Sequence, residues 1–283
     1  MLQLLYDSRD DPYHERVGSQ IVYWLDDLGA VPLSEADSTC DGFLFTGARP
    51  IEDYRELVAR LPLVRDRPEE REPLLRLDAV LHVLERAGVR VASPRTWVLP
   101  LDAALPEDLT FPLFVRTAES SWKKGGPISR VQTPAALLDE AALLRRALGW
   151  DATILARQWL DLIPAGESTY GLVSQEVRTW VVDAVPIAWS FHYMHVMPKP
   201  VGFPPSAADL AILRQMACEV ASAFSSRLVV ADFARGRDGR WWFIEAGPGS
   251  CAGTGHEKVF KSIACRLRGV KGEFQADALG GPL

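Results

Sequence analysis

The stretch 227–255 reads RLVVADFARGRDGRWWFIEAGPGSCAGTG and predicts a β-hairpin. Its Asp238-Gly239 pair predicts a two-residue type I′ turn, because both central residues of that turn need a positive φ. In the resulting register Asp232 lies directly opposite Glu245 on one face of the sheet. Facing residues in antiparallel strands have Cβ atoms roughly 4.5–5.5 Å apart, so two carboxylates there repel each other. The hairpin therefore predicts a site where a cation joins the two carboxylates.

A divalent metal ion is the cation that this pair favours. Hard oxygen ligands suit Mg²⁺ that is held together with substrate phosphates, so Asp232 and Glu245 are the predicted metal ligands. Two other interpretations remain open, a solvated edge hairpin and a pair in which one carboxyl stays protonated with a raised pKa. A slip of one residue in the register would also put the two groups on opposite faces.

The composition is that of a soluble globular chain. The 283 residues are 48% hydrophobic and 24% charged, and the formal net charge of −6 argues against general nucleic-acid binding. The four cysteines are scattered, which predicts free thiols in a reducing compartment. The start of the chain turns acidic too soon for a signal peptide, and no 18-residue apolar run exists. We expect a cytoplasmic protein that does not bind membranes, and the sequence leaves its oligomeric state open.

Apolar periodicity and turn residues predict a mixed α/β (α+β) chain. The expected strands are 2–6, 42–46, 89–99, 111–118, 153–160, 176–184, 186–193, 227–235 and 240–246, and the expected helices are 17–28, 51–61, 74–87, 134–148 and 207–226. Strand and helix alternate in the first part, which is typical of parallel pairing. Everything after Lys258 is expected to be a terminal helix and a small, loosely ordered tail.

Two other motifs lack the context that their chemistry needs. Gly247, Gly249 and Ala252 fit a G-x-G-x-x-A spacing, but too little chain follows them to complete a dinucleotide-binding unit. His192 and His195 lack a matching cysteine pair or a helical H-E-x-x-H setting, so we expect structural or solvent-exposed histidines there.

Separated cations precede the hairpin. Arg116 lies inside the apolar strand FPLFVRTA, Lys123 and Lys124 lie beside two glycines, and Glu176 and Arg178 share one face at the start of a strand. Taken singly, each has a simpler explanation. Arg116 fits a surface arginine, the two lysines fit a solvated loop tip, and Glu176 with Arg178 fits a surface ion pair worth less than about 1 kcal/mol. Their order along the chain is the specific signal.

That order resembles the ATP-grasp superfamily, and an arginine followed by two lysines is similar to its arginine-and-two-lysine subclade, found in bacteria and phages. The resemblance covers roughly residues 74–258. It implies the following roles: nucleotide contacts for Arg116, Lys123, Lys124, Glu176 and Arg178; adenine contacts for the backbone of Gln158, Trp159 and Leu160; a ribose contact for Asp161; metal binding for Asp232 and Glu245; and catalytic roles for Arg178 and Lys124.

The resemblance also implies an architecture, that of two α+β subdomains that grip ATP, preceded by a small Rossmann-like α/β lobe. The proline-rich and charged segment 62–72 marks the first boundary. The expected divisions are 1–73 for the lobe and 74–283 for the ATP-grasp domain, with 74–155 as the first subdomain and its lid loop, 156–270 as the second with the metal site, and 271–283 as a tail.

The implied function is that of a ligase that uses Mg²⁺ and ATP to join a carboxylate to an amine through an acyl phosphate, with release of ADP and phosphate. Its substrates are expected to be small molecules or peptides, with an amino acid or a peptide as the leading candidate. A phosphotransferase that uses the same cleft is an alternative. A non-catalytic nucleotide-binding or sensing protein is another.

Two positions depart from the family pattern. The usual Glu-x-Asn is Glu245-Ala246-Gly247 here, which removes an amide ligand and leaves Ser250 as a candidate substitute. The usual first lysine is Arg116, which suits bidentate contact with phosphate. Three aromatic side chains and the loop 198–205 are candidates for an acceptor pocket, and core packing explains the aromatic ones equally well: Trp180, Trp189 and Phe191.

Overall fold

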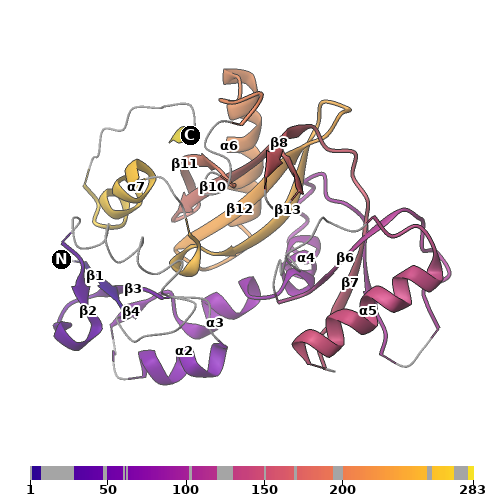
Figure 1. Cartoon of the computed structure of the whole chain (residues 1–283). Coiled ribbons are helices and arrows are strands. Elements are labelled where there is room, and N and C mark those ends of the chain that lie inside the picture. The colour runs from indigo at the N-terminus through magenta and orange to yellow at the C-terminus, as the bar shows by residue number, and fades with distance from the viewer. Residues whose placement is uncertain are drawn as a thin grey trace.

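The chain is described here from a computed structural model. The structure describes residues 2–7, 29–46, 50–59, 61, 63–101, 104–119, 130–149, 151–168, 171–193, 200–253, 257–270 and 280–283. Within these ranges four β-sheets are flanked by helices, and the largest sheet lies between an N-terminal lobe and a smaller lobe (Figure 1). None of the helices in these ranges combines the length and apolar character needed to cross a lipid bilayer. The mixed α/β architecture is as predicted.

The N-terminal lobe contains a parallel sheet in the order β2-β1-β3-β4. Its elements are β1 (Gln3–Tyr6), β2 (Val31–Pro32), η1 (Leu33–Glu35), β3 (Gly42–Phe45), α2 (Ile51–Val58) and β4 (Val64–Arg65). Tyr54 and Leu57 of α2 pack on Leu5, Leu44 and Val64, so the helix covers one face of the sheet. The helix predicted over 17–28 lies outside the described residues.

A buried polar network joins this lobe to the rest of the chain. The segment after β4 contains α3 (Pro68–Arg71) and η2 (Glu72–Leu74). The carboxylate of Asp66 accepts hydrogen bonds from Ser226 (2.5 Å) and Ser250 (2.9 Å), and Arg71 donates to Thr46 (3.2 Å). The apolar core is continuous across the same junction, since side chains of β1 and β3 cluster with those of α7 (Glu257–Leu267) and the central sheet.

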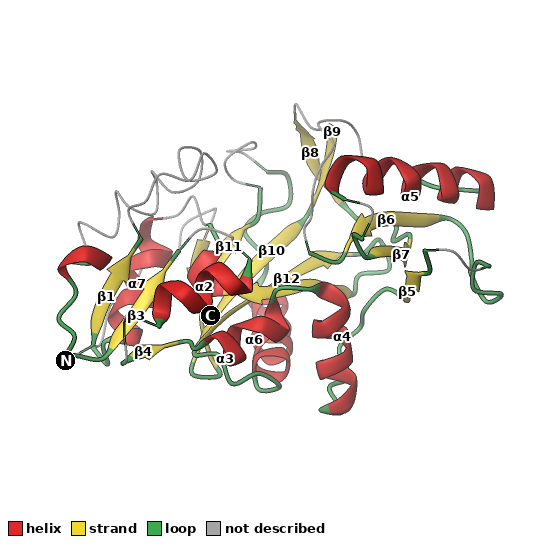
Figure 2. Ribbon diagram, turned by 90° about the horizontal axis from the view of Figure 1, so that it is seen from below, coloured by secondary structure: helices red, strands yellow, loops and turns green. Residues whose placement is uncertain are grey.

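The smaller lobe is an antiparallel sheet covered by one helix. The strands β5 (Thr96–Leu99), β7 (Ile154–Gln158) and β6 (Leu113–Thr117) pair in that order, and α5 (Pro134–Leu148) packs on one face. The α5 helix begins as predicted, with the Thr133 hydroxyl accepting the Ala136 N–H at 3.2 Å. The opposite face of the sheet is turned toward the central sheet (Figure 2).

The central sheet is antiparallel, in the order β13-β12-β10-β11-β14. On one face it is covered by α4 and α6, and on part of the other by α7. The remaining elements are α4 (Leu77–Arg86), β8 (Pro164–Ser168), β9 (Gly171–Ser174), β10 (Glu176–Val182), β11 (Val185–Phe191), α6 (Ala207–Ala221), β12 (Leu228–Arg235), β13 (Trp241–Pro248), η3 (Gly249–Cys251) and β14 (Gly280–Pro282).

Alternation along the strands divides the α7 face into two halves. Trp180 pairs with Val230, and these residues pack beneath α7. Two positions further along the same face, Arg178 pairs with Asp232. Because side chains at i and i+2 share a face, the polar pair lies beyond α7, on the part of the sheet that faces the smaller lobe.

The hairpin forms, but the turn predicted at Asp238-Gly239 is wrong. The Gly236 N–H donates to the Arg240 carbonyl (2.8 Å) and the Gly239 N–H to the Gly236 carbonyl (2.9 Å), which closes a three-residue loop over 237–239. Only Gly239 of this loop has a positive φ (80°). The physical reason is that Asp238 is held by its own side chain, which accepts the Arg240 N–H at 3.0 Å.

The expected loosely ordered tail is also corrected in part. Gly280–Pro282 form β14 and pair with β11, so these residues complete one edge of the central sheet. The segment 271–279 lies outside the described residues. The aromatic candidates for an acceptor pocket are core residues instead, each at most 1% exposed: Trp180, Trp189 and Phe191.

The side chain of Asp238 should contribute measurably to stability. Asp238→Gly should lower the urea concentration at the midpoint of unfolding, because glycine loses the side-chain bonds to Arg240 and gains entropy in the unfolded chain. Urea unfolding of the variant beside the parent measures this. In a two-residue type I′ turn the same change would relieve strain, so a more stable variant would restore the original prediction.

Candidate functional site

Asp232 and Glu245 face each other across β12 and β13, as predicted, but a β-bulge is needed to bring them together. The three-residue loop shifts the pairing by one residue, and Phe233 therefore pairs with Phe243. Between Asp232 and Phe233 the pairing shifts back, which makes Ile244 the extra residue of the bulge. Without the bulge, Ile244 would stand opposite Asp232 and the Glu245 side chain would turn to the other face.

Contacts from outside the hairpin hold this bulge. Arg157 of β7 donates from Nη1 to the Ile244 carbonyl at 2.8 Å, and the Phe243 N–H donates to the Ala92 carbonyl at 2.7 Å. A bulge disrupts the ladder, so its backbone groups need partners elsewhere. The register of the two carboxylates is therefore supported by residues outside the hairpin, including one from the smaller lobe.

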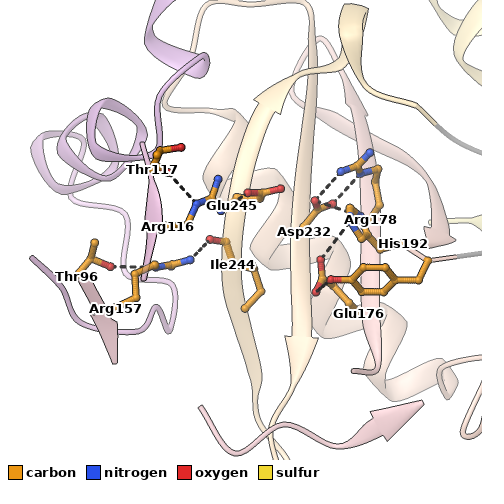
Figure 3. Close-up of polar contacts among 11 residues, drawn as sticks. Thr96, Arg116, Thr117, Arg157, Glu176, Arg178, His192, Asp232, Ile244 and Glu245 are labelled. Carbon is orange, nitrogen blue, oxygen red and sulfur yellow. Dashed lines mark hydrogen bonds and ion pairs between the residues drawn. The ribbon is translucent and has the colours of Figure 1, made fainter. Parts of the chain in front are cut away.

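Arg116 extends from β6 of the smaller lobe toward Glu245 (Figure 3). It is only 6% exposed, so it is not the outward-facing surface residue that was its alternative explanation. Its Nη1 donates to Glu245 Oε2 at 2.5 Å, and its Nε donates to the Thr117 carbonyl at 3.1 Å. Burial raises the pKa of Glu245, but the charge and hydrogen bond of Arg116 outweigh it and hold that pKa below its ordinary value.

Arg178 and Asp232 form a bidentate ion pair on the central sheet. Arg178 Nε donates to Oδ1 at 2.9 Å and Nη2 to Oδ2 at 2.7 Å, while Nη1 donates to the Gly253 carbonyl at 2.9 Å. Burial acts to lower the pKa of Arg178, but the charge and hydrogen bonds of Asp232 raise it above its usual value. The surface ion pair considered for Glu176 and Arg178 is excluded, because both of these side chains are largely buried.

Glu176 lies on the same face, next to two residues that sequence reasoning did not select. The Tyr193 hydroxyl donates to Glu176 Oε2 at 3.2 Å. The His192 ring lies between two carboxylates, with Nε2 at 3.6 Å from Glu176 Oε1 and Nδ1 at 3.4 Å from Asp232 Oδ2 (Figure 3). His192 is therefore not a solvent-exposed residue remote from the site. Its only sequence signal was its place at the end of a predicted hairpin strand.

Each carboxylate of the predicted metal site already has an arginine partner. Repulsion between Asp232 and Glu245 is therefore relieved by guanidinium groups, and the charge argument alone does not require a metal ion. The donor set nevertheless fits a hard cation, because Glu245 Oε1 accepts no hydrogen bond from a described residue and the side chain is 19% exposed. Glu176, His192 and Asp232 also place one ligand atom each within 4.8 Å of one another.

The predicted adenine segment lies at the end of β7. The N–H groups of Gln158 and Trp159 are already donated, to the carbonyls of Arg95 (2.8 Å) and Pro112 (3.0 Å). Asp161 has an exposed carboxylate that pairs with Arg237 at 3.1 Å. The first two N–H groups of this segment are therefore not free to contact a base.

Two of the predicted cations lie outside the described residues, Lys123 and Lys124. Ser250 does not replace the missing asparagine, since its hydroxyl belongs to the network with Asp66 and Arg71 at the N-terminal lobe. The described residues therefore bring together Arg116, Glu176, Arg178, Asp232 and Glu245 from the predicted set.

A known protein family matches the part of the chain that contains this site. A family model for the ATP-grasp domain, family 3 of the arginine-and-two-lysine clade, matches residues 90–267. A search of curated proteins gave no match.

Several solved structures share the fold. D-alanine–D-alanine ligase from Bacillus anthracis complexed with ATP matches with a TM-score of 0.62 and 14% identity, over 95% of this chain and 92% of that one. The D-cycloserine synthetase DcsG matches with a TM-score of 0.56 and 14% identity, over 94% and 99%. Carboxyaminoimidazole ribonucleotide synthase from Aspergillus clavatus complexed with ATP matches with a TM-score of 0.66 and 13% identity, over 98% and 79%.

At these identities the structural matches establish the fold, while the family model covers more than half of the chain. Together with the paired strands and the cations described above, it establishes that the chain belongs to the ATP-grasp domain family, in its arginine-and-two-lysine clade.

Proposed function

We propose that this chain is an ATP-dependent ligase that joins a carboxylate to an amine through an acyl phosphate. The observation that carries the proposal is the presence of two ion pairs in an ATP-grasp domain, Asp232–Arg178 within the central sheet and Glu245–Arg116 between that sheet and the smaller lobe. Buried, hydrogen-bonded charges of both signs can stabilise a triphosphate and its metal ion at fixed positions.

The proposed reaction has two steps. An oxygen of the acid attacks the γ-phosphorus of ATP, the bond from that phosphorus to the bridging oxygen breaks, and ADP leaves. The amine nitrogen then attacks the acyl carbon, the carbon–oxygen bond to phosphate breaks, phosphate leaves and the nitrogen releases a proton. Phosphoryl transfer depends mainly on positioning and charge neutralisation, so no protein nucleophile is needed.

Arginine and lysine side chains hold the phosphates in this proposal. Arg116 acts from the smaller lobe, Lys123 and Lys124 act from the loop after it, and Arg178 acts from the central sheet. Arg178 and Lys124 are the proposed catalytic cations. A Mg²⁺ ion held by carboxylate oxygens would supply further neutralisation of phosphate charge.

The remaining predicted residues complete the nucleotide site. We assign the adenine contact to the backbone of Gln158, Trp159 and Leu160 and the ribose contact to Asp161. Glu176 and Arg178 would lie beside the phosphates and the acceptor, and Asp232 and Glu245 would hold the metal ion.

Amino acids or peptides are the proposed substrates. Two of the similar structures support this choice by name, a D-alanine–D-alanine ligase and a D-cycloserine synthetase. The smallest test set is therefore the free amino acids of both configurations, supplied as acid and amine together.

A non-catalytic nucleotide-binding protein is the second candidate. Its support is the Glu245-Ala246-Gly247 sequence, which lacks an amide ligand, together with the arginine pairing of both carboxylates. This candidate predicts tight binding of ATP with no ADP formed over hours.

The first test is nucleotide binding. Isothermal titration with a non-hydrolysable ATP analogue should give a dissociation constant in the micromolar range, weakened about tenfold or more without Mg²⁺ because phosphate charge is then less neutralised. The absence of binding in both conditions would remove the proposal.

The second test is substitution of the carboxylates. Asp232→Asn and Glu245→Gln should each reduce ADP formation by about 100-fold or more. The Asp232 change also leaves Arg178 buried without its counter-ion, which costs about 3–5 kcal/mol of stability, so thermal melting must accompany it. Glu245→Gln decides the question if the other variant does not fold.

A matched control exists for these variants. Asp183 forms the same bidentate geometry with Arg227, at 2.7 Å for both contacts, on the turn between β10 and β11 and away from the site. Asp183→Asn should leave ADP formation unchanged. Full activity in both site variants would contradict the proposed metal and phosphate roles.

The third test separates the ligase from its rivals. Release of inorganic phosphate should require both an acid and an amine, because the acyl phosphate breaks down productively only when an amine attacks it. A coupled assay for inorganic phosphate measures this, with the acid omitted in one reaction and the amine omitted in another. A stable phosphorylated product would favour a phosphotransferase instead.

A further inference from the structure

Arg157 is a buried arginine of the site that the family pattern did not select. In the β6–β7 pairing it stands opposite Phe114, while Arg116 stands opposite Leu155. Since positions two apart share a face, Arg157 and Arg116 point to the same side of the sheet, away from α5 and toward β13 (Figure 3). Arg157 is 3% exposed.

The charge partners of the three site arginines differ. Arg116 pairs with Glu245 and Arg178 pairs with Asp232. Within the described ranges the hydrogen bonds of Arg157 go to neutral groups: Nε donates to Thr96 Oγ1 at 3.2 Å and Nη1 donates to the Ile244 carbonyl at 2.8 Å. Its second terminal nitrogen, Nη2, is buried and has no hydrogen-bond partner among the described residues.

Such an arrangement is unfavourable without an anion. A buried charge is normally paired, and a buried N–H without an acceptor pays its full desolvation cost. Burial, and then the positive charge of Arg116, lower the pKa of Arg157 to about 9, against the opposing effect of the Glu245 and Glu176 charges, so the guanidinium is still charged at pH 7. Neither carboxylate accepts a hydrogen bond from Arg157 among the described residues, so Nη2 still lacks an acceptor.

We propose that Arg157 is an additional phosphate-binding residue, whose Nη2 donates to an oxygen of the nucleotide phosphate chain beside Arg116. This rests on the proposed function, which supplies the nucleotide. A phosphate oxygen meets both requirements at once, because it is an acceptor for the N–H and a counter-charge for the two arginines. The contact to Ile244 is compatible with this role, since it uses a different nitrogen.

A ladder of ligands tests the proposal. Adenosine, AMP, ADP and a non-hydrolysable ATP analogue are titrated calorimetrically into the parent chain, Arg157→Gln and Arg157→Lys. Arg157→Gln should bind adenosine within twofold of the parent but lose about tenfold or more in affinity for the phosphate-bearing ligands. Arg157→Lys should show a smaller loss confined to the same ligands, because lysine retains the charge but not the fork of N–H groups.

Arg145→Gln is the control. Arg145 lies on α5, on the opposite face of the same sheet, and donates to the carbonyl of Pro100 at 3.1 Å. It makes no ion pair among the described residues, so the control removes a similar charge without touching the site. All four affinities should stay within twofold of the parent.

The outcomes distinguish failure of the proposed function from failure of the role of Arg157. A parent chain that binds no nucleotide overturns the proposed function and this inference together. If affinity rises with each added phosphate by the same factor in the parent and in Arg157→Gln, the inference about Arg157 is overturned and the proposed function is not. An equal loss for adenosine and the phosphate-bearing ligands would assign Arg157 to the bulge or the base, and also overturns it. If Arg157→Gln does not fold, the Arg157→Lys variant decides. An Arg157→Lys variant that loses no affinity for the phosphate-bearing ligands relative to adenosine also overturns the inference.

Discussion

The register between β12 and β13 is the constraint on which the site depends. Side chains alternate between faces with a period of two, so a shift of one residue exchanges every side chain between the core and the site. The three-residue loop introduces such a shift, and the bulge at Ile244 cancels it before Asp232. The carbonyl of Ile244 is bonded to Arg157 of another sheet. The carboxylate pair is thus a product of the hairpin and its neighbour together.

The second organising feature is the balance of charge beyond α7. Paired side chains of opposite sign meet there in a poorly solvated region: Arg116 with Glu245 and Arg178 with Asp232. Breaking one member of such a pair is far more costly than the net stabilisation that the pair provides. A ligand that carries both negative charge and a cation can pair its negative charge with the arginines and its cation with the carboxylates. No side chain of the site is then left without a counter-charge. In this way a tightly paired site could accept the nucleotide of the proposed function.

Local patterns were sufficient for much of this architecture. The order of strands and helices followed from residue types and spacing, and the family resemblance is confirmed by the family model. The pairing of Asp232 with Glu245 was predicted from a two-residue turn that does not form, and it is correct because the bulge at Ile244 compensates for the longer loop. The bulge could not be predicted, because it depends on a contact with Arg157 that exists only after the sheets pack. His192 was missed for the same reason, since sequence spacing does not reveal which carboxylates a ring will approach.

The junction at the N-terminal lobe has a mechanical consequence. That lobe shares an apolar core with the central sheet and is tied to it through Asp66 and Arg71, so both apolar and polar contacts hold the two together. The smaller lobe reaches β13 through the side chains of Arg116 and Arg157 instead. A rotation of that lobe away from β13 would break both contacts. Opening would therefore separate one ion pair, break one hydrogen bond to a neutral carbonyl and expose the apolar contact of Ala118 and Leu155 with Leu77 of α4.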